Sequence, residues 1–395
     1  MPGDFQDDLA SLLDDVYDEM IDIRHDLHAH PELSFQEHRT SQVIRDRLAT
    51  LGWEVANCPT DTGAVATLRG SRAGRRVMIR ADIDGLPVTE DRQPDYVSVN
   101  EGVMHACGHD VHTASLLGIA DMFSRQRDQL AGEYTLLFQP AEEGLGGAKA
   151  MIDAGVLDAH PVDFVIGAHV ASILPLGFVA VRSGINWSQA NAFTVHLEGV
   201  GGHGAVPTVA GSVVLAVSAL APRLGEVVEG LEFGGTACVC SAGVIHAGTK
   251  NNVVPRSGEL RGTIRTFTPD QLPQAVARFE AILREIEDAF SVTCTLGFDE
   301  AAPALENDAA VTDRAIASAG EIVGADNVLD LSPITFSDDM AEFLNRVPGC
   351  YLVIGGALAD GTSGMHHSPE FAVDDAACRT FAGVLANLAV DLAQS

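Results

Sequence analysis

The chain has 395 residues, of which 46% are apolar, enough for two or three folded domains with proper cores. A net charge of −31 makes nucleic acid and anionic membrane surfaces poor partners, because binding to either needs clustered lysine and arginine. The acidic N-terminal stretch lacks the basic and apolar regions of a secretory signal, and no apolar run reaches membrane-spanning length. Seven scattered cysteines are typical of a reducing compartment, so we expect a cytoplasmic protein.

The first part of the chain predicts two helices and then an alternation of strands and helices. Apolar residues from Leu9 to Leu27 recur at helical spacing, so a first helix ends before Pro31, and a second spans 41–51. The elements predicted next are strands at 64–68 and 77–81, a helix at 112–123, and strands at 134–138 and 162–168. This order indicates a largely parallel α/β sheet covered by helices on both faces.

From about residue 187 the pattern becomes that of a second, smaller domain. Its predicted elements are a strand at 193–197, a helix at 209–228, strands at 236–245 and 259–267, a helix at 270–290 and a strand at 292–298. This βαββαβ order is that of a ferredoxin-like sandwich. The α/β pattern then resumes with a helix at 308–323, a strand at 351–354 and a helix from Asp374. We therefore expect a catalytic domain formed by 1–186 and 300–395, with 187–299 inserted as a lid.

Acidic residues and a histidine follow three strands of the predicted sheet, namely Asp82, Asp84, Glu142, Glu143 and His169. The carboxyl ends of parallel strands meet at one edge of a sheet, where ligands bind. Adjacent carboxylates repel each other unless a cation or a proton lies between them. One member of the Glu142–Glu143 pair can therefore bind a metal while the other handles protons.

The stretch MHACGHDVH, residues 104–112, combines a thiol, three imidazoles and a carboxylate. Cys107 and His109 flank Gly108, which permits a tight approach, so both side chains can face one small volume. A buried thiol beside an incidental histidine is the alternative interpretation. Half of a metal site at this stretch requires further ligands from elsewhere in the chain.

The positions above combine into a candidate set of soft and borderline ligands, which are Cys107, His109, Glu143, His169 and His367. Five ligands exceed the need of one tetrahedral ion, so we expect a pair of divalent cations. Zinc, cobalt and nickel suit the thiolate and imidazoles, and manganese suits the carboxylate. Such a pair supplies the Lewis acidity for amide hydrolysis, with Glu142 taking and returning a proton.

Seven stretches together resemble the metal-dependent aminoacylase, carboxypeptidase and amidohydrolase family, in the branch of hippurate hydrolase and the plant auxin-conjugate hydrolases. They span nearly the whole chain and are RADIDGLPVTE from Arg80, MHACGHDVH from Met104, FQPAEEGLGGA from Phe138, GGHGAVP from Gly201, NVVP from Asn252, GTIRTF from Gly262 and HSPEF from His367. The resemblance implies a metal-dependent amidohydrolase that converts N-acyl-L-amino acids to a carboxylate and a free amino acid. It also implies a homodimer, or a higher oligomer, formed through the lid domain.

The resemblance assigns roles at the metal pair. Cys107 bridges both metals, and the shells are completed by His109, Glu143, His169 and His367. Glu142 is the general base and later the acid, and Asp82 orients a ligand from outside the metal shell. A histidine ligand of the wider family is replaced here by Arg80, and His109 compensates for its loss.

The resemblance also assigns roles in the lid. His203 stabilises the oxyanion of the tetrahedral intermediate, and Asn252 and Arg265 hold the substrate carboxylate. An outward-facing structural role is the alternative for Arg265. The chain departs from the pattern of the branch at Thr208, at Asn191 and at 336–340. These departures concern substrate choice and pocket shape.

Other functions compete with this interpretation. A dipeptidase or carboxypeptidase would use the same metal pair and differ only in accepting a free substrate amine. A cysteine-nucleophile amidase would use Cys107 with His109 or His105 as its base. A non-catalytic ligand-binding relative would have lost the base or a ligand, whereas this chain retains every one of them.

Overall fold

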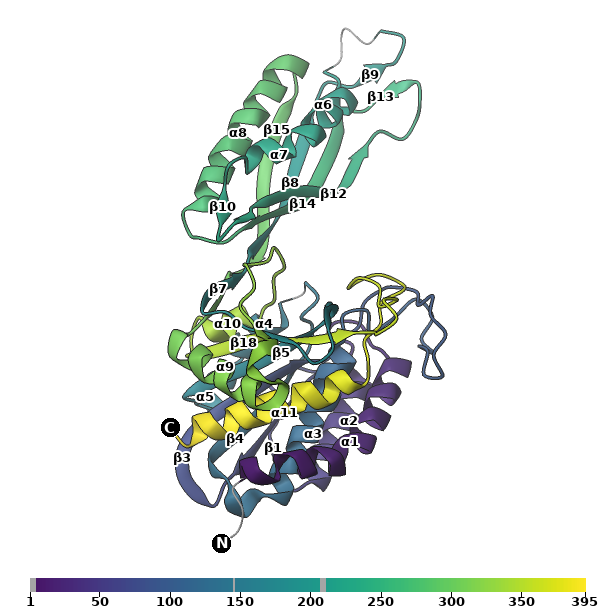
Figure 1. Ribbon diagram of the computed structural model, residues 1–395. Helices are drawn as coiled ribbons and strands as arrows, with labels where there is room; N and C mark the ends of the chain where they lie inside the picture. Colours follow the sequence, from purple (N-terminus) through teal and green to yellow (C-terminus); the bar gives the residue numbers. More distant parts are fainter. Residues whose placement is uncertain (1–4, 145, 207–210) are drawn as a thin grey trace. The chain divides into compact units, whose positions relative to one another are not determined.

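The computed structural model describes residues 5–144, 146–206 and 211–395, and the chain divides into two compact units (Figure 1). Unit 1 comprises Met1–Gly184, Glu306–Leu331 and Asp339–Ser395. Unit 2 comprises Ile185–Leu305 and Ser332–Asp338. The short segment 332–338 therefore belongs to unit 2, whereas the predicted boundaries assign all of 300–395 to the catalytic domain.

An eight-stranded sheet in the order β1-β2-β4-β3-β5-β18-β6-β17 forms the centre of unit 1. Its strands are β1 (Glu54–Val55), β2 (Ala64–Arg69), β3 (Arg72–Asp82), β4 (Ala131–Gln139), β5 (Phe164–Pro175), β6 (Val179–Ala180), β17 (Val328–Leu329) and β18 (Gly349–Ala357). The central strands β4, β3, β5 and β18 run parallel to one another, so their carboxyl ends lie along one edge. β2 pairs antiparallel with β4, so the sheet is mixed.

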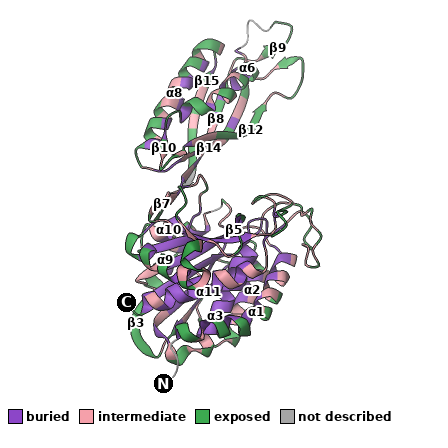
Figure 2. Ribbon diagram, in the orientation of Figure 1, coloured by how far each residue is buried: buried purple, intermediate pink, exposed green. Residues whose placement is uncertain are grey.

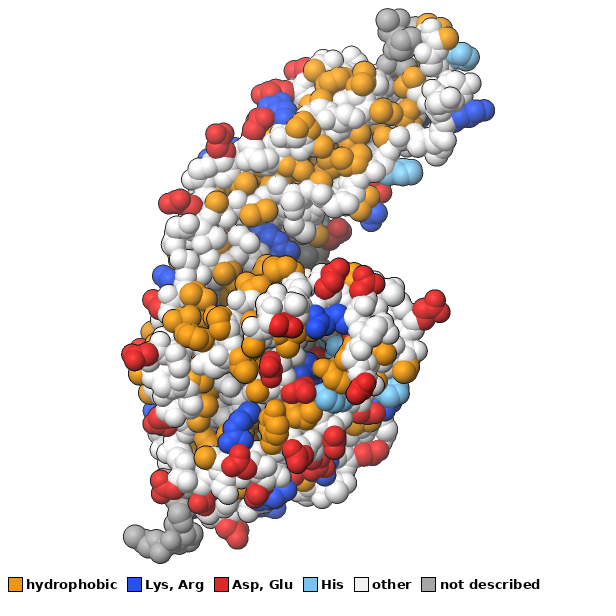
Figure 3. All heavy atoms as spheres, turned by 45° about the vertical axis from the view of Figure 1, so that its right-hand side comes forward, with side chains coloured by type: hydrophobic (Ala, Val, Ile, Leu, Met, Phe, Trp, Pro, Cys, Tyr) orange, Lys and Arg blue, Asp and Glu red, His pale blue; other side chains and the backbone are white. Residues whose placement is uncertain are grey.

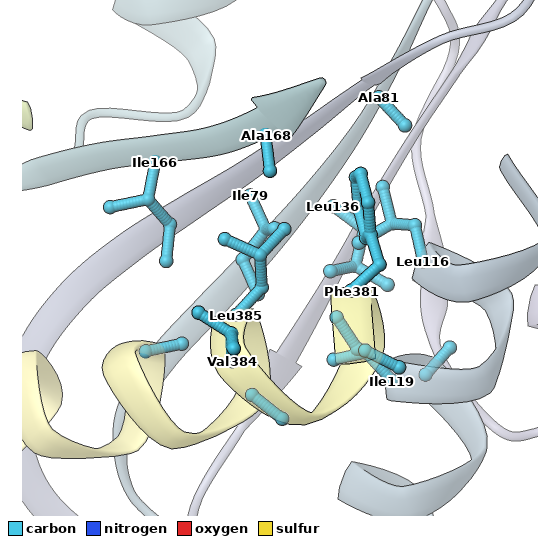
Figure 4. Packing of buried hydrophobic residues seen from close by; sticks show 14 of the residues in the cluster. Ile79, Ala81, Leu116, Ile119, Leu136, Ile166, Ala168, Phe381, Val384 and Leu385 are labelled. Atoms are coloured by element: carbon cyan, nitrogen blue, oxygen red, sulfur yellow. The ribbon is translucent and has the colours of Figure 1, made fainter. Parts of the chain in front are cut away.

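The helices of unit 1 cover this sheet. They are α1 (Phe5–Ala29), α2 (His38–Thr50), α3 (His109–Arg125), α4 (Gly147–Asp153), α5 (Val156–Ala159), α9 (Ala309–Val323), α10 (Ala341–Leu344) and α11 (Ala376–Ala393), with 3-10 turns at Arg127–Gln129 and Ala325–Asn327. Figure 2 shows buried residues concentrated in the strands and in α3 and α11. In Figure 4, Phe381 and Leu385 of α11 point toward Ile79 and Leu136 of the sheet. Alternate residues of β3 thus face the helices, as the period of two along a strand requires.

One helix among the described residues, α11, has the length and composition of a membrane span. It has 18 residues and a mean hydropathy of 1.3, yet 78% of it is buried inside the protein. Its neighbours are α1, α3, α9 and the sheet. A helix that is apolar on all sides and enclosed in this way is a core helix.

Unit 2 is built on a four-stranded antiparallel sheet in the order β12-β14-β8-β15. Its main elements are β8 (Gln189–Glu198), α6 (Val213–Leu220), α7 (Leu224–Val227), β12 (Val239–Ala247), β14 (Ser257–Thr266), α8 (Gln271–Phe290) and β15 (Thr293–Ala302). Its short strands are β7 (Gly184–Trp187), β9 (Gly202–His203), β10 (Glu232–Phe233), β11 (Thr236–Ala237) and β13 (Val253–Val254), and β16 (Leu305–Asn307) falls at its boundary with unit 1. The predicted βαββαβ order is confirmed.

The helix predicted at 209–228 differs in detail. Residues 209 and 210 lie outside the described part of the chain, and the remainder forms α6, a 3-10 turn at Ala221–Arg223 and α7. Pro222 lies in that turn. Proline has no backbone N–H and clashes with the preceding helical turn, so a continuous α-helix is interrupted there.

Candidate metal centre

Unit 1 brings the five predicted ligands close together. The ligand atoms of Cys107, His109 and Glu143 lie within 4.8 Å of one another. Cys107 Sγ lies 3.4 Å from His169 Nε2. His367 Nε2 lies 3.2 Å from Glu143 Oε1. His169 was expected to follow its strand, but β5 continues past it to residue 175 and pairs it with Val353 of β18.

Gly108 sets the spacing of Cys107 and His109. It precedes α3 with a φ of +90°, a region that favours glycine. A Cβ at this position would lie 2.4 Å from Cγ1 of the buried Val170. Glycine therefore allows Cys107 to stand just before the helix while His109 is its first residue.

Backbone carbonyls fix the tautomers of His109 and His169. His109 Nδ1 lies 2.9 Å from the backbone carbonyl of Asp84, and His169 Nδ1 lies 2.6 Å from the carbonyl of Val170. A carbonyl only accepts, so Nδ1 carries the proton in both rings. His109 Nε2 is buried and has no hydrogen-bond partner. Both imidazoles therefore have the tautomer that suits an Nε2 ligand.

Two further histidines lie at the site with the same tautomer, but a backbone N–H occupies the Nε2 atom of each, and the sequence interpretation gave neither of them a role. Val170 donates its backbone N–H to His112 Nε2 at 2.9 Å, and Ser172 donates its own to His366 Nε2 at 3.2 Å. An Nε2 atom that accepts an N–H carries the lone pair, which leaves the proton on Nδ1. Neither nitrogen of these rings is then available to a cation. The one sequence signal for His112 is its position three residues after His109, on the same helix face.

Asp82 was predicted to orient a metal-bound imidazole, and that role stays a prediction. Its Oδ1 accepts from His112 Nδ1 at 2.5 Å, and its Oδ2 accepts from Arg80 Nη1 at 2.7 Å. The carboxylate beside Nδ1 of His109 belongs instead to Asp84, at 3.2 Å. Asp84 is thus the residue whose contacts orient a predicted ligand directly.

Arg80, which by the family resemblance replaces a histidine, forms a buried ion network. Besides Asp82, it donates to Asp339 Oδ1 at 2.9 Å and to Gln139 Oε1 at 2.9 Å. Asp339 Oδ2 accepts from the backbone N–H of Ala148 at 2.9 Å, at the start of α4. The guanidinium pairs with two buried carboxylates, which would be costly to bury unpaired. Gln139 precedes the glutamate pair and Ala148 follows it. The network therefore holds the chain on both sides of Glu142 and Glu143.

Glu142 and Glu143 lie in a tight turn between β4 and α4. Their backbone N–H groups donate to Asp84 Oδ1 at 3.2 Å and to Asp84 Oδ2 at 3.1 Å, respectively. The turn also needs a glycine, because a Cβ on Gly147 would lie 1.7 Å from the carbonyl oxygen of Pro140. The Gly-rich sequence after the glutamates is therefore a requirement of the turn that presents them.

The electrostatics of the site favour a cation. Burial on its own lowers the pKa of His109, but the carboxylates of Asp82, Asp84 and Glu143 raise it to about 10. Burial, together with the nearby carboxylates of Glu143 and Glu142, holds the pKa of the Cys107 thiol well above its usual range. Glu143 Oε1, like His109 Nε2, is buried without a hydrogen-bond partner. The excess negative charge and these unpartnered atoms fit a pair of divalent cations.

The predicted lid residues all lie in unit 2. His203 is exposed on β9, and its Nδ1 accepts from the backbone N–H of Ala205 at 3.1 Å. The carbonyl of Asn252 accepts from the backbone N–H of Gly204 at 2.9 Å, so Asn252 lies beside the antiparallel pair of β9 and β13. Arg265 is half-buried and donates through Nη1 to the Thr335 carbonyl at 2.9 Å. Thr208, one of the predicted departures, lies outside the described residues.

Comparison with known proteins agrees with this geometry. The model of peptidase family M20/M25/M40 matches residues 78–391. Thermostable carboxypeptidase 1 of Saccharolobus solfataricus is 35% identical over 384 residues, which cover 94% of this chain and 95% of that protein. N-acyl-L-amino acid amidohydrolase of Geobacillus stearothermophilus is 40% identical over 303 residues, covering 74% and 79%.

A solved structure of the same family is also similar. The YXEP protein of Bacillus subtilis, described as a dinuclear metal-binding peptidase from the M20 family, superposes with a TM-score of 0.80 at 29% identity. The match covers 96% of this chain and 98% of that one. With a family match over more than half of its length and relatives along nearly all of it, the chain belongs to peptidase family M20/M25/M40 and is a hydrolase.

Proposed function

We propose that the chain is a metal-dependent amidohydrolase that cleaves the amide bond of N-acyl-L-amino acids to give a carboxylate and a free amino acid. One observation carries the proposal. His109 Nε2 and Glu143 Oε1 are buried without a hydrogen-bond partner and lie 3.9 Å apart, and both are within 4.8 Å of the sulfur of Cys107. The amidohydrolase from Geobacillus stearothermophilus supports the substrate class.

The residues that would hold two divalent cations are Cys107, His109, Glu143, His169 and His367. When bound, the cations supply Lewis acidity that polarises the scissile carbonyl and acidifies a water molecule. The thiolate and imidazoles suit zinc, cobalt or nickel, and the carboxylate also suits manganese.

Glu142 is the proposed general base. It lies in the same turn as Glu143, and the backbone N–H groups of the two residues bond to the two oxygens of Asp84, so one carboxylate holds the backbone of both. Glu142 takes a proton from the attacking water as the oxygen adds to the amide carbon. It returns that proton to the nitrogen as the C–N bond breaks, a contribution of about 10²–10⁴-fold in rate.

The proposed substrate contacts come from unit 2. His203 would stabilise the oxyanion, and Asn252 with Arg265 would hold the substrate carboxylate. The contacts of Arg265 with Thr335 and Ser337 both use Nη1. A guanidinium has five N–H donors, so others can form a fork with a planar carboxylate.

The edge of unit 2 supports the proposal of a homodimer. β12 is an edge strand, and Ile245 on it is 50% exposed, while Leu215 on the neighbouring α6 is 59% exposed. Figure 3 shows hydrophobic side chains gathered on the surface of unit 2. An exposed apolar edge strand is a template for pairing with a second copy. All seven cysteines are free thiols, which supports the proposed cytoplasmic location.

Two alternatives use the same residues. A dipeptidase or carboxypeptidase is the second candidate, favoured by 35% identity to thermostable carboxypeptidase 1. A cysteine-nucleophile amidase is disfavoured, because burial and carboxylates raise the pKa of the Cys107 thiol. The imidazoles in contact with its sulfur are His169 and His366, not the proposed bases His105 and His109.

The test is hydrolysis of N-acetyl, N-benzoyl and long-chain acyl amino acids and of unblocked dipeptides by metal-stripped protein with each divalent cation restored. Metal-dependent release of an amino acid from the acylated substrates, lost in Glu142→Gln and retained in the exposed control Glu101→Gln, is the expected result. Preference for dipeptides would favour the second candidate. Activity that survives metal removal, or normal turnover by Glu142→Gln, would overturn the proposal.

A further inference from the structure

We propose that His366 is a positioning residue that donates its ring N–H to the sulfur of Cys107, while the adjacent His367 supplies the metal ligand. This inference rests on the proposed metal-dependent function. The two histidines are neighbours in the sequence MHHSP, and family resemblance assigns a role to His367 alone. The structure separates their tasks by the groups that each ring faces.

His366 faces the thiol. Its Nδ1 lies 3.6 Å from Cys107 Sγ, and its Nε2 accepts the backbone N–H of Ser172 at 3.2 Å. The Ser172 contact places the lone pair on Nε2 and the proton on Nδ1. A donor N–H is therefore directed at the sulfur. A metal bond from Nδ1 would move the ring proton to Nε2, where it would face the backbone N–H of Ser172.

His367 faces the carboxylate of Glu143. Its Nε2 lies 3.2 Å from Glu143 Oε1, and its backbone N–H donates to the carbonyl of Ala106 at 2.8 Å. The residue has a φ of +65°, and the rings of His366 and His367 face different partners across this turn. The Ala106 hydrogen bond fixes the loop beside Cys107, so both histidines are held against the same short segment.

Packing holds the ring of His366 in place. Its centroid lies 4.8 Å from that of Phe371 and 5.3 Å from that of His169. A ring confined on two sides and anchored at Nε2 has little freedom to turn Nδ1 away from the sulfur. An N–H bond to a ligating thiolate withdraws charge from the sulfur and orients its remaining lone pairs, as other hydrogen bonds to metal ligands do.

Two substitutions separate the two nitrogens of the ring. In His366→Asn, the amide nitrogen takes roughly the place of Nδ1 and can still donate to the sulfur. In His366→Gln, the longer side chain reaches the place of Nε2, where its oxygen can accept from Ser172, but no donor remains at the sulfur. Both variants are polar and of similar size, and thermal unfolding shows whether each is folded.

The measurement is cobalt titration of the metal-stripped protein, followed through the near-ultraviolet sulfur-to-cobalt charge-transfer band. We expect His366→Gln to move the band to longer wavelength and to raise the cobalt dissociation constant by about 10-fold or more. We expect His366→Asn to keep both values close to those of the wild type. A band that His366→Gln leaves in place would overturn the inference. So would cobalt binding lost as completely in both variants as in His367→Leu, because His366 would then be a ligand. Absence of the band in the wild-type protein would instead remove the proposed metal centre itself.

Discussion

Oδ2 of Asp84 accepts a hydrogen bond from the backbone N–H of Glu143 at 3.1 Å. The other oxygen of the same carboxylate lies 3.2 Å from His109 Nδ1 and 3.2 Å from the backbone nitrogen of Glu142. One buried side chain thus positions two predicted ligands and the proposed general base. The pKa of Asp84 lies below its ordinary value, because these hydrogen bonds outweigh the effect of burial.

We expect Asp84→Asn to lower the affinity for divalent cations by about 10- to 100-fold. An asparagine offers one acceptor oxygen where the carboxylate offers two, so at least one of the side-chain contacts to His109, Glu142 and Glu143 is lost. Calorimetric titration of the metal-stripped protein with zinc measures the change. Asp61→Asn, which alters an exposed carboxylate, is the matched control. Equal zinc affinity in Asp84→Asn and the wild type would show that Asp84 does not position the ligands.

Much of the ligand set could be predicted from sequence because it is recorded locally. Cys107 and His109 share one short motif, the glutamates are adjacent, and His169 lies in an apolar strand. The alternation of strands and helices indicated a largely parallel sheet whose carboxyl ends meet at one edge. Such features depend on residues close together in the chain, which sequence patterns report well.

The remaining features depend on contacts between distant segments. Arg80 and Asp339 are 259 positions apart, and no local pattern indicates that they pair. The orientation of His366 depends on the backbone of Ser172, 194 positions away. Sequence spacing gives the identity of an imidazole but not which of its nitrogens accepts a hydrogen bond. The antiparallel pairing of β2 was missed for the same reason, since strand order follows from tertiary packing.

Gly108 gives a second prediction. We expect Gly108→Ala to destabilise unit 1 by about 1–3 kcal/mol, because the new Cβ would overlap Val170 Cγ1 in a packed core. Gly102→Ala is the control, since Gly102 also has a positive φ, of +77°, but nothing lies within 4 Å of its Cβ position. Denaturant unfolding measures the loss in free energy of unfolding for both variants. The difference between the two losses is the cost of the overlap with Val170, apart from backbone strain. If the two variants lose the same stability, backbone conformation alone explains the glycine.

A third prediction concerns His28, which lies buried between two carboxylates. Its Nδ1 lies 3.0 Å from Asp110 Oδ2, and its Nε2 lies 3.3 Å from Glu90 Oε1. Arg24 donates to the same Asp110 oxygen at 3.2 Å, and Tyr96 packs edge-on against the ring of His28. Burial alone lowers the pKa of His28, but Asp110 and Glu90 raise it to about 9.

The folded-state pKa of His28 is higher than the ordinary value of about 6.5, so its stabilising effect is complete below that pH and is lost as pH rises through about 9. We expect the free energy of unfolding to fall over this window by an amount on the order of 3 kcal/mol. Urea unfolding at intervals from pH 6 to pH 10 measures the slope. His28→Gln should flatten that slope, whereas His30→Gln, in a half-exposed position, should not. An unchanged slope in His28→Gln would assign the pH dependence to other groups.

The fourth prediction concerns the net charge of −31. Figure 3 shows acidic side chains distributed over the surface of unit 1. Like charges at this density repel one another, and salt screens them, since the Debye length falls from about 30 Å at 0.01 M to about 3 Å at 1 M. We therefore expect the melting temperature to rise with sodium chloride concentration over that range.

Helix α1 offers a matched pair of variants to test this origin. Asp18 and Asp22 are exposed and lie four residues apart, so their carboxylates repel by a few tenths of a kcal/mol, about the size of an i,i+4 pair. Asp14, in contrast, pairs with Arg379 at 2.6 Å. We expect Asp18→Asn to raise the melting temperature at 0.01 M salt and to have no effect at 1 M, while Asp14→Asn gives no gain at either concentration. If Asp18→Asn stabilises equally at both, the gain comes from helix propensity, and repulsion between surface charges is not its cause.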